Sequence, residues 1–124
     1  TENTAQIPSA LAALAAQDVG VLAINGGDGT CSAILGEMLE SNIFETLPLI
    51  AVLPGGTANM NAGDIGIGGS LTKATDQFCR WCKNGQDGGS ERASRSLLRV
   101  QLATDPTPRY GMFLGAGAVI QGTD

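Results

Sequence analysis

The chain has 124 residues, of which 43% are hydrophobic and only 4% aromatic, so it can bury a single-domain core of aliphatic side chains. Its net charge of −5 argues against a general nucleic-acid binder, because such binding relies on basic side chains that neutralise phosphates. No stretch reaches the roughly 18–20 apolar residues that span a bilayer, and the absence of histidine excludes a Ser-His-Asp triad or a histidine metal site.

The first half of the chain alternates predicted helices with short apolar runs. Residues 9–17 are rich in strong helix formers and predict the end of a helix. Residues 19–24 and 47–53 are continuous apolar runs, which are typical of strands buried on both faces of a parallel sheet. We expect Thr30 to N-cap a helix between these strands, and Ser70 to N-cap a later helix. This alternation predicts an α/β fold.

The pattern changes near residue 90. Residues 85–96 are polar and rich in turn formers, which is typical of a linker or loop. Residues 97–103 alternate apolar with polar side chains, which predicts a half-buried antiparallel strand. Residues 105–108 (Asp-Pro-Thr-Pro) predict a turn, and further strand is expected over 110–114 and 118–120.

The chain is therefore predicted to have two parts. Residues 1–90 are expected to form an α/β domain around a parallel sheet. Residues 91–124 are expected to begin a β-rich second domain, and the sequence ends before that domain could close a sheet.

The three cysteines are an odd number, which fits a reduced cytosolic chain better than a disulfide framework. Cys79 and Cys82 form a CxxC, the spacing of redox and zinc sites. However, this pair falls near the end of a predicted helix, and no second ligand pair accompanies it. We therefore interpret both as ordinary helix cysteines.

Two glycine-rich turns carry the functional signal. Residues 26–30 follow the first predicted strand, and residues 54–57, with Asn59 close behind, follow the second. Ligands of open α/β sheets bind at the carboxyl ends of the strands, so we expect both turns to face one crevice. The first turn presents backbone N–H groups at a helix N-terminus, an arrangement that binds anions. The two turns together indicate a shared ligand site.

Asp28 is the unusual residue in the first turn, because it puts a carboxylate where an anion would sit. This is unfavourable unless a cation lies between the two charges, or unless the carboxylate turns away to brace neighbouring backbone. Both possibilities remain open from sequence. The usual phosphate-binding alternatives are missing, since neither a GxxxxGK[ST] loop nor a G-x-G-x-x-G fingerprint occurs.

These residues resemble a known family. Residues 26–30 (GGDGT) resemble the signature shared by diacylglycerol kinases, sphingosine kinases, NAD kinases and, more distantly, 6-phosphofructokinases. Residues 53–59 (LPGGTAN) resemble the second diacylglycerol-kinase motif, commonly written PxGTxND. NAD kinases lack the Gly-Thr-x-Asn element, so the pair of motifs favours the lipid-kinase branch.

The resemblance implies an ATP-dependent lipid kinase. With Mg²⁺, it would transfer the γ-phosphoryl group of ATP to the hydroxyl of diacylglycerol or a related lipid. The implied enzyme is cytoplasmic, acts at the membrane surface on its lipid acceptor, and places ATP in a cleft between an α/β and a β-rich domain. Asp28 is implied to be the family's essential acidic residue and to be catalytic, either linked to a cation or assisting the acceptor hydroxyl. The residues implied to bind the nucleotide are Gly26, Gly27, Asp28, Gly29, Thr30, Gly55, Gly56, Thr57 and Asn59.

The chain departs from this family pattern in three respects. Met60 stands where the family usually has Asp, and a methionine can neither ligate Mg²⁺ nor carry charge. Asp64 lies four residues further on but is not assigned that role, so the metal ligands stay unassigned. The opening strand with its phosphate loop and most of the C-terminal domain are also missing, so we expect a fragment that carries a nucleotide half-site and does not catalyse alone.

Two alternative functions remain open. The first is a small-molecule kinase similar to NAD kinases, which the second motif disfavours. The second is a non-catalytic nucleotide-binding module, which is suggested by Met60.

Overall fold

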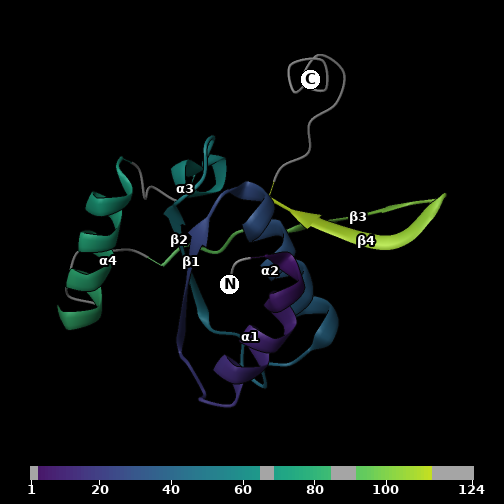
Figure 1. Ribbon diagram of the computed structural model, residues 1–124, viewed down its shortest axis with the longest axis horizontal. Helices are drawn as coiled ribbons and strands as arrows, with labels where there is room; N and C mark the ends of the chain where they lie inside the picture. Colours follow the sequence, from purple (N-terminus) through teal and green to yellow (C-terminus); the bar gives the residue numbers. More distant parts are fainter. Residues whose placement is uncertain (1–2, 65–68, 85–91, 113–124) are drawn as a thin grey trace.

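The computed structural model describes residues 3–64, 69–84 and 92–112. Helices and a parallel strand pair come first, and an antiparallel hairpin follows, which confirms the predicted α/β class (Figure 1). In chain order the elements are η1 (Thr4–Gln6), α1 (Ile7–Ala15), β1 (Val21–Gly26), α2 (Asp28–Ser41), β2 (Leu49–Pro54), α3 (Met60–Asp64), α4 (Leu71–Asn84), β3 (Leu98–Leu102) and β4 (Asp105–Gly111).

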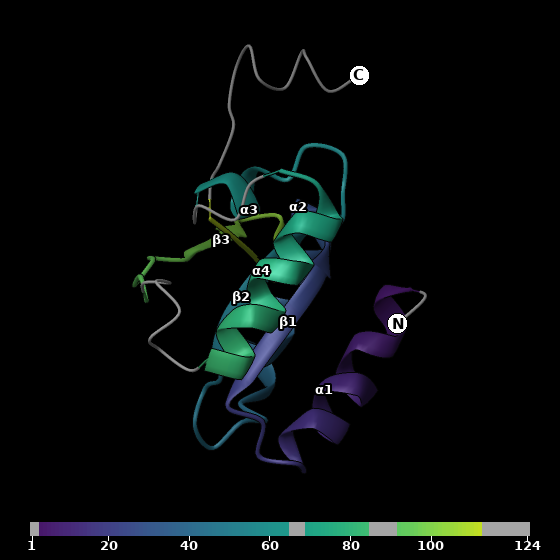
Figure 2. The ribbon, with the colours of Figure 1, turned by 90° about the vertical axis from the view of Figure 1, so that its left-hand side faces the viewer.

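The sheet is built from the two predicted apolar runs. β1 and β2 pair in parallel, with Val21 opposite Leu49 and Gly26 opposite Pro54. The connection between parallel strands crosses over through α2, which packs on one face of the pair, while α4 packs on the other (Figures 1 and 2). Because the strands end in register, both glycine-rich turns leave the sheet at the same edge.

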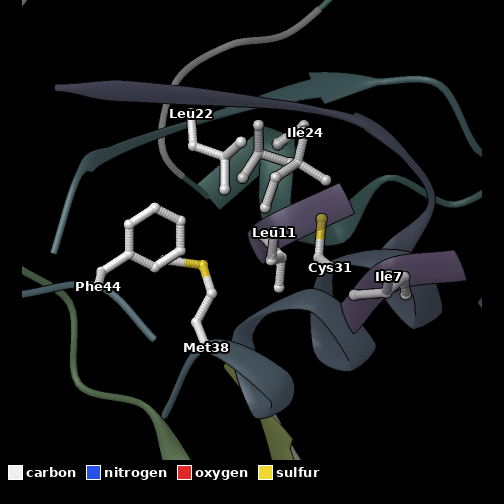
Figure 3. Close-up of a cluster of buried hydrophobic side chains, with 9 residues drawn as sticks. Ile7, Leu11, Leu22, Ile24, Cys31, Met38 and Phe44 are labelled. Carbon is white, nitrogen blue, oxygen red and sulfur yellow. The ribbon is translucent and has the colours of Figure 1, made fainter. Parts of the chain in front are cut away.

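The main core lies between the sheet and helices α1 and α2. Side chains from both helices and both strands meet there, with only one aromatic ring among them (Figure 3). Its buried members are Ile7, Leu11, Leu22, Ile24, Cys31, Met38, Phe44, Val52 and Ala62. Each fully buried aliphatic side chain of this size stabilises the fold by about 1.5–3 kcal/mol, so this cluster fixes α2 against the strands.

Helix α2 begins earlier than predicted, and the assignment of Thr30 as its N-cap is wrong. Gly27 occupies that position in an extended conformation, and its carbonyl accepts the N–H of Cys31 at 3.1 Å. The side chain of Thr30 instead lies against Gly26, where an added Cβ would come within 2.8 Å of it. Because Gly26 has no side chain, Thr30 can pack against its backbone, and the turn is tight.

Helix α4 matches its prediction. The Oγ of Ser70 accepts the N–H of Lys73 at 3.3 Å, as an N-cap does. Ala74 is buried against β2, and the rings of Phe78 and Trp81 stack with centroids 6.2 Å apart. The two CxxC cysteines are exposed and free on the last two turns of this helix. No helix in the described part of the chain has the length and apolar character needed to cross a bilayer.

The antiparallel pairing of β3 with β4 was predicted, but the position of the turn was wrong. Residues 103–104 form the turn, and the predicted turn over 105–108 is the first half of β4. Within the described residues β4 pairs with β3 alone, and strands at a sheet edge tolerate proline. The apolar side chains of β3 were predicted to form a half-buried face. Leu98 and Leu102 are instead 42% and 54% exposed. Further strand was predicted over 110–114 and 118–120; residues 110–111 belong to β4, and residues from 113 onward lie outside the described residues.

Candidate functional site

The two glycine-rich turns lie against each other at the carboxyl ends of β1 and β2. A Cβ added at Gly56 would come within 2.3 Å of the Cα of Gly27. One added at Gly55 would come within 2.2 Å of Oδ1 of Asn25 and 2.9 Å of the backbone nitrogen of Gly26. No side chain fits at either position, so the second turn needs glycine for this backbone contact.

The first turn is the N-terminus of a long helix. The helical hydrogen-bond pattern of α2 begins with Cys31, so the amides of Asp28, Gly29 and Thr30 precede it. None of the glycines in this turn has a positive φ. A Cβ at Gly29 would meet no atom within 4 Å, so open space adjoins this residue. Such a helix start attracts anions through its N–H groups and the positive end of the helix dipole.

The second turn is shaped by Asn59. Its Oδ1 accepts the N–H of Gly56 and its Nδ2 donates to the carbonyl of Gly56, both at 2.7 Å. Asn59 has a φ of 52°, a left-handed conformation that asparagine tolerates better than most residues. Thr57 and Ala58, at the tip of the turn, are exposed. The side chain of Asn59 therefore closes the turn on itself.

Asp28 joins the two turns. Its Oδ2 accepts the N–H of Met60 at 3.0 Å, and its Oδ1 accepts the N–H of Asn61 at 2.8 Å. These are the first two residues of α3, so a carboxylate in the first turn of α2 caps a different helix 32 residues further along the chain. Of the two possibilities left open by the sequence, the structure shows the one in which Asp28 braces backbone.

Asn61 and Cys31 are buried next to this contact. Asn61 is 4% exposed, and its Oδ1 has no hydrogen-bond partner among the described residues. Cys31 is 1% exposed, and its pKa is raised by burial and then by the negative charge of Asp28, while a hydrogen bond with the side chain of Asn61 acts in the opposite direction. Asn61 could not be recognised from the sequence, because a polar residue directly after a turn gives no signal of burial.

The acidic residues near the second turn do not form a metal centre. The side chain of Met60 is exposed, and only its backbone amide engages Asp28. Asp64 is held by Arg95, with Oδ2 3.0 Å from Nε. Over the described ranges, no group of three or more acidic, cysteine or histidine side chains could hold a metal ion.

The hairpin packs along the side of α2. The Oγ of Ser32 donates a hydrogen bond to the carbonyl of Tyr110, and the Tyr110 hydroxyl donates one to Glu40. Arg99 donates to the same hydroxyl at 2.9 Å. The hydrogen bond to Glu40 raises the pKa of Tyr110. These contacts connect the hairpin to the helix that begins at the first turn.

Comparison with known families agrees with the two motifs. The family model described as the diacylglycerol kinase catalytic domain matches residues 1–90, which include both turns. No curated protein and no solved structure matches the chain. Since the matched region covers well over half of the 124 residues, the chain belongs to the diacylglycerol kinase catalytic domain family, a family of lipid kinases.

Proposed function

We propose that this chain carries the ATP-binding half-site of a lipid kinase, which transfers the γ-phosphoryl group of ATP to the hydroxyl of diacylglycerol or a related lipid. Membership of the diacylglycerol kinase catalytic domain family supports the reaction class. The observation that carries the nucleotide assignment is the contact between the two glycine-rich turns at the N-terminus of α2. In this proposal the acceptor lipid is presented from a membrane surface on the cytoplasmic side.

The free amides at the start of α2 fit a phosphate chain. Asp28, Gly29 and Thr30 supply N–H groups that precede the helical hydrogen-bond pattern, and open space adjoins Gly29. The exposed Thr57 hydroxyl supplies a further polar group from the second turn. Because the chain has only seven basic residues and a net charge of −5, such backbone donors are the natural partners for phosphate here.

Asp28 is the one acidic side chain at this junction, and each of its oxygens already accepts a backbone hydrogen bond. In this proposal no described side chain is assigned as a ligand of Mg²⁺. When bound with ATP, Mg²⁺ supplies neutralisation of phosphate charge. Phosphoryl transfer also requires that the phosphate oxygens be held in fixed positions. The residues of this half-site supply that positioning.

The nucleotide assignment is tested by equilibrium binding. The purified protein should bind ATP and ADP but not adenosine, because the phosphates supply the contacts. Binding of adenosine as strong as that of ATP, or no binding of ATP, would overturn the assignment.

The reaction is tested in a protein that contains both halves of the site, by following labelled γ-phosphate from ATP into two acceptors, diacylglycerol in detergent micelles and NAD. Transfer to diacylglycerol supports the lipid kinase, and transfer to NAD supports a kinase similar to NAD kinases. Binding of ATP without transfer to either acceptor supports a non-catalytic module, the candidate favoured by Met60 in the place of an acidic residue.

A further inference from the structure

We propose that Asp28 is a positioning residue, which acts on the nucleotide by holding the second glycine-rich turn against the start of α2. The family resemblance implies a catalytic acid at this position, whereas the contacts of Asp28 point to a brace between two backbone segments. The inference rests on the proposed nucleotide site, since that site is what the brace would position.

The hydrogen bonds of Asp28 are specific to α3. They run from the amides of Met60 and Asn61, at 3.0 and 2.8 Å, one to each carboxylate oxygen. Hydrogen bonds to an ionised acceptor are roughly twice as strong as those between neutral groups. A carboxylate with one N–H bond on each oxygen is fixed in orientation, and so is the pair of amides that it binds.

The second turn depends on this brace. The helix that follows the turn, α3, has five residues, far below the length at which an isolated helix is stable in water. The reciprocal bonds between Asn59 and Gly56 set the internal shape of the turn but do not attach it to α2. Attachment comes from the close backbone contact of Gly27 with Gly56 and from Asp28.

The buried side chain of Asn61 makes the brace more necessary. An amide oxygen that is buried without a partner disfavours the folded position of α3. The bond from the N–H of Asn61 to Asp28 offsets that tendency and keeps the side chain over Cys31. Loss of the carboxylate should therefore release α3 and expose the Cys31 thiol.

The same contacts explain how a carboxylate is tolerated beside a phosphate site. The two backbone N–H dipoles at the start of α3 counter part of the negative charge of Asp28. The amides of Gly29 and Thr30 remain available to a phosphate, because Asp28 turns to α3 and caps none of them.

The first experiment measures release of α3 through thiol labelling. In the folded wild-type protein, a thiol reagent should modify the exposed Cys79 and Cys82 quickly and the buried Cys31 slowly. Asp28→Ala should raise the labelling rate of Cys31 about tenfold or more, with Cys79 and Cys82 as internal references. Asp64→Ala is the matched control, since Asp64 lies on α3 but pairs with Arg95 and has no bond to α2. An unchanged Cys31 rate in Asp28→Ala would overturn the proposal.

The second experiment separates positioning from metal binding. If Asp28 is a positioning residue, Asp28→Ala should weaken ATP binding by about tenfold, the equivalent of about 1.4 kcal/mol. The factor should be the same whether the titration contains Mg²⁺ or EDTA. Asp28→Asn should lie between wild type and Asp28→Ala, because its amide retains one acceptor oxygen but opposes the second N–H with a donor. A loss confined to the Mg²⁺ condition would assign Asp28 to the metal and overturn the proposal.

The two experiments fail independently of each other. If the wild-type protein binds no ATP, the proposed function fails, and the labelling of Cys31 still decides whether Asp28 holds α3 in place. If circular dichroism shows that Asp28→Ala is unfolded, the comparison of Asp28→Asn with wild type decides instead whether Asp28 positions α3.

Discussion

The two glycine-rich turns have similar compositions but are built in different ways. The first turn is the start of the 14-residue helix α2, which is fixed by Cys31 and Met38 in the core. The second turn precedes a helix of five residues and is held by backbone N–H groups that donate to the side chains of Asn59 and Asp28. The first is therefore placed by the core, and the second by a few polar contacts with the first.

Glycine therefore has a different structural role in each turn. Gly29 faces open space, so the protein itself has room for a side chain there. Gly55 and Gly56 face backbone at distances that exclude a Cβ. At Gly29 the first turn thus leaves space for a ligand, while the second turn uses Gly55 and Gly56 to approach the first. Substitutions that fill these spaces should have opposite effects on stability.

Gly56→Ala should break the contact between the turns and have the largest effect. The added Cβ would lie 2.3 Å from the Cα of Gly27, so one backbone must move. We expect a loss of about 1–3 kcal/mol in the free energy of unfolding, as is typical for overpacking, and a loss of ATP binding. Chemical denaturation and nucleotide titration measure both effects.

Gly63→Ala is the control for that change. Gly63 lies on α3, and a Cβ there meets no atom within 4 Å, so this variant should keep or slightly raise the stability of the protein. Equal losses in Gly56→Ala and Gly63→Ala would mean that α3 itself, and not the contact between the turns, is sensitive to added side chains.

Asn59→Ala should have the next largest effect, because it removes the two bonds to Gly56 and leaves alanine at a φ of 52°. We expect a loss of about 2 kcal/mol in the free energy of unfolding. Asn59→Gly removes the same bonds but accepts the left-handed conformation, so its loss should be about 1 kcal/mol. Thermal unfolding of the pair separates the contribution of backbone conformation from that of the hydrogen bonds. Identical values would show that the conformation contributes nothing.

Much of this arrangement could be predicted from sequence because it follows from local patterns. Continuous apolar runs predicted β1 and β2, and their parallel pairing brought the turns together as expected. Ser70 was recognised as a cap because the bond it makes is to a residue three positions away. Apolar runs and capping are short-range rules, and they located these elements. The expected burial of β1 on both faces was wrong, however, because its residues alternate between buried and exposed.

The parts that could not be predicted depend on contacts between distant residues. The bonds from Asp28 to α3 span 32 and 33 residues, and no local pattern encodes them. Thr30 has good N-cap chemistry, but Gly27 is the residue whose extended conformation starts the helix. The prolines after residue 104 indicated a turn, yet β4 accommodates them as a strand with a single described neighbour. In each case tertiary packing decided between locally acceptable alternatives.

Gly29→Ala tests the other half of the comparison. Since the added Cβ meets no protein atom, the free energy of unfolding should stay the same or rise by up to about 1 kcal/mol, as for glycine to alanine in a helix. ATP binding should nevertheless weaken by about tenfold, because the side chain would occupy the space beside the amides of α2. Unchanged ATP affinity in this stable variant would mean that the phosphates of ATP do not bind at the first turn.

Asn61→Leu should have the smallest effect, and it should be favourable. Leucine has the same number of side-chain heavy atoms and the same branching, removes the buried amide oxygen that has no described partner, and retains the backbone N–H that Asp28 accepts. Replacing an unsatisfied buried polar group by an apolar one should raise the free energy of unfolding by about 1 kcal/mol. Thermal denaturation of Asn61→Leu against wild type measures this gain, and Asn61→Asp, which buries a second carboxylate near Asp28, should be destabilised. A loss of stability in Asn61→Leu would mean that the amide is satisfied by a group beyond the described residues, in which case α3 is anchored from its buried side as well as by Asp28.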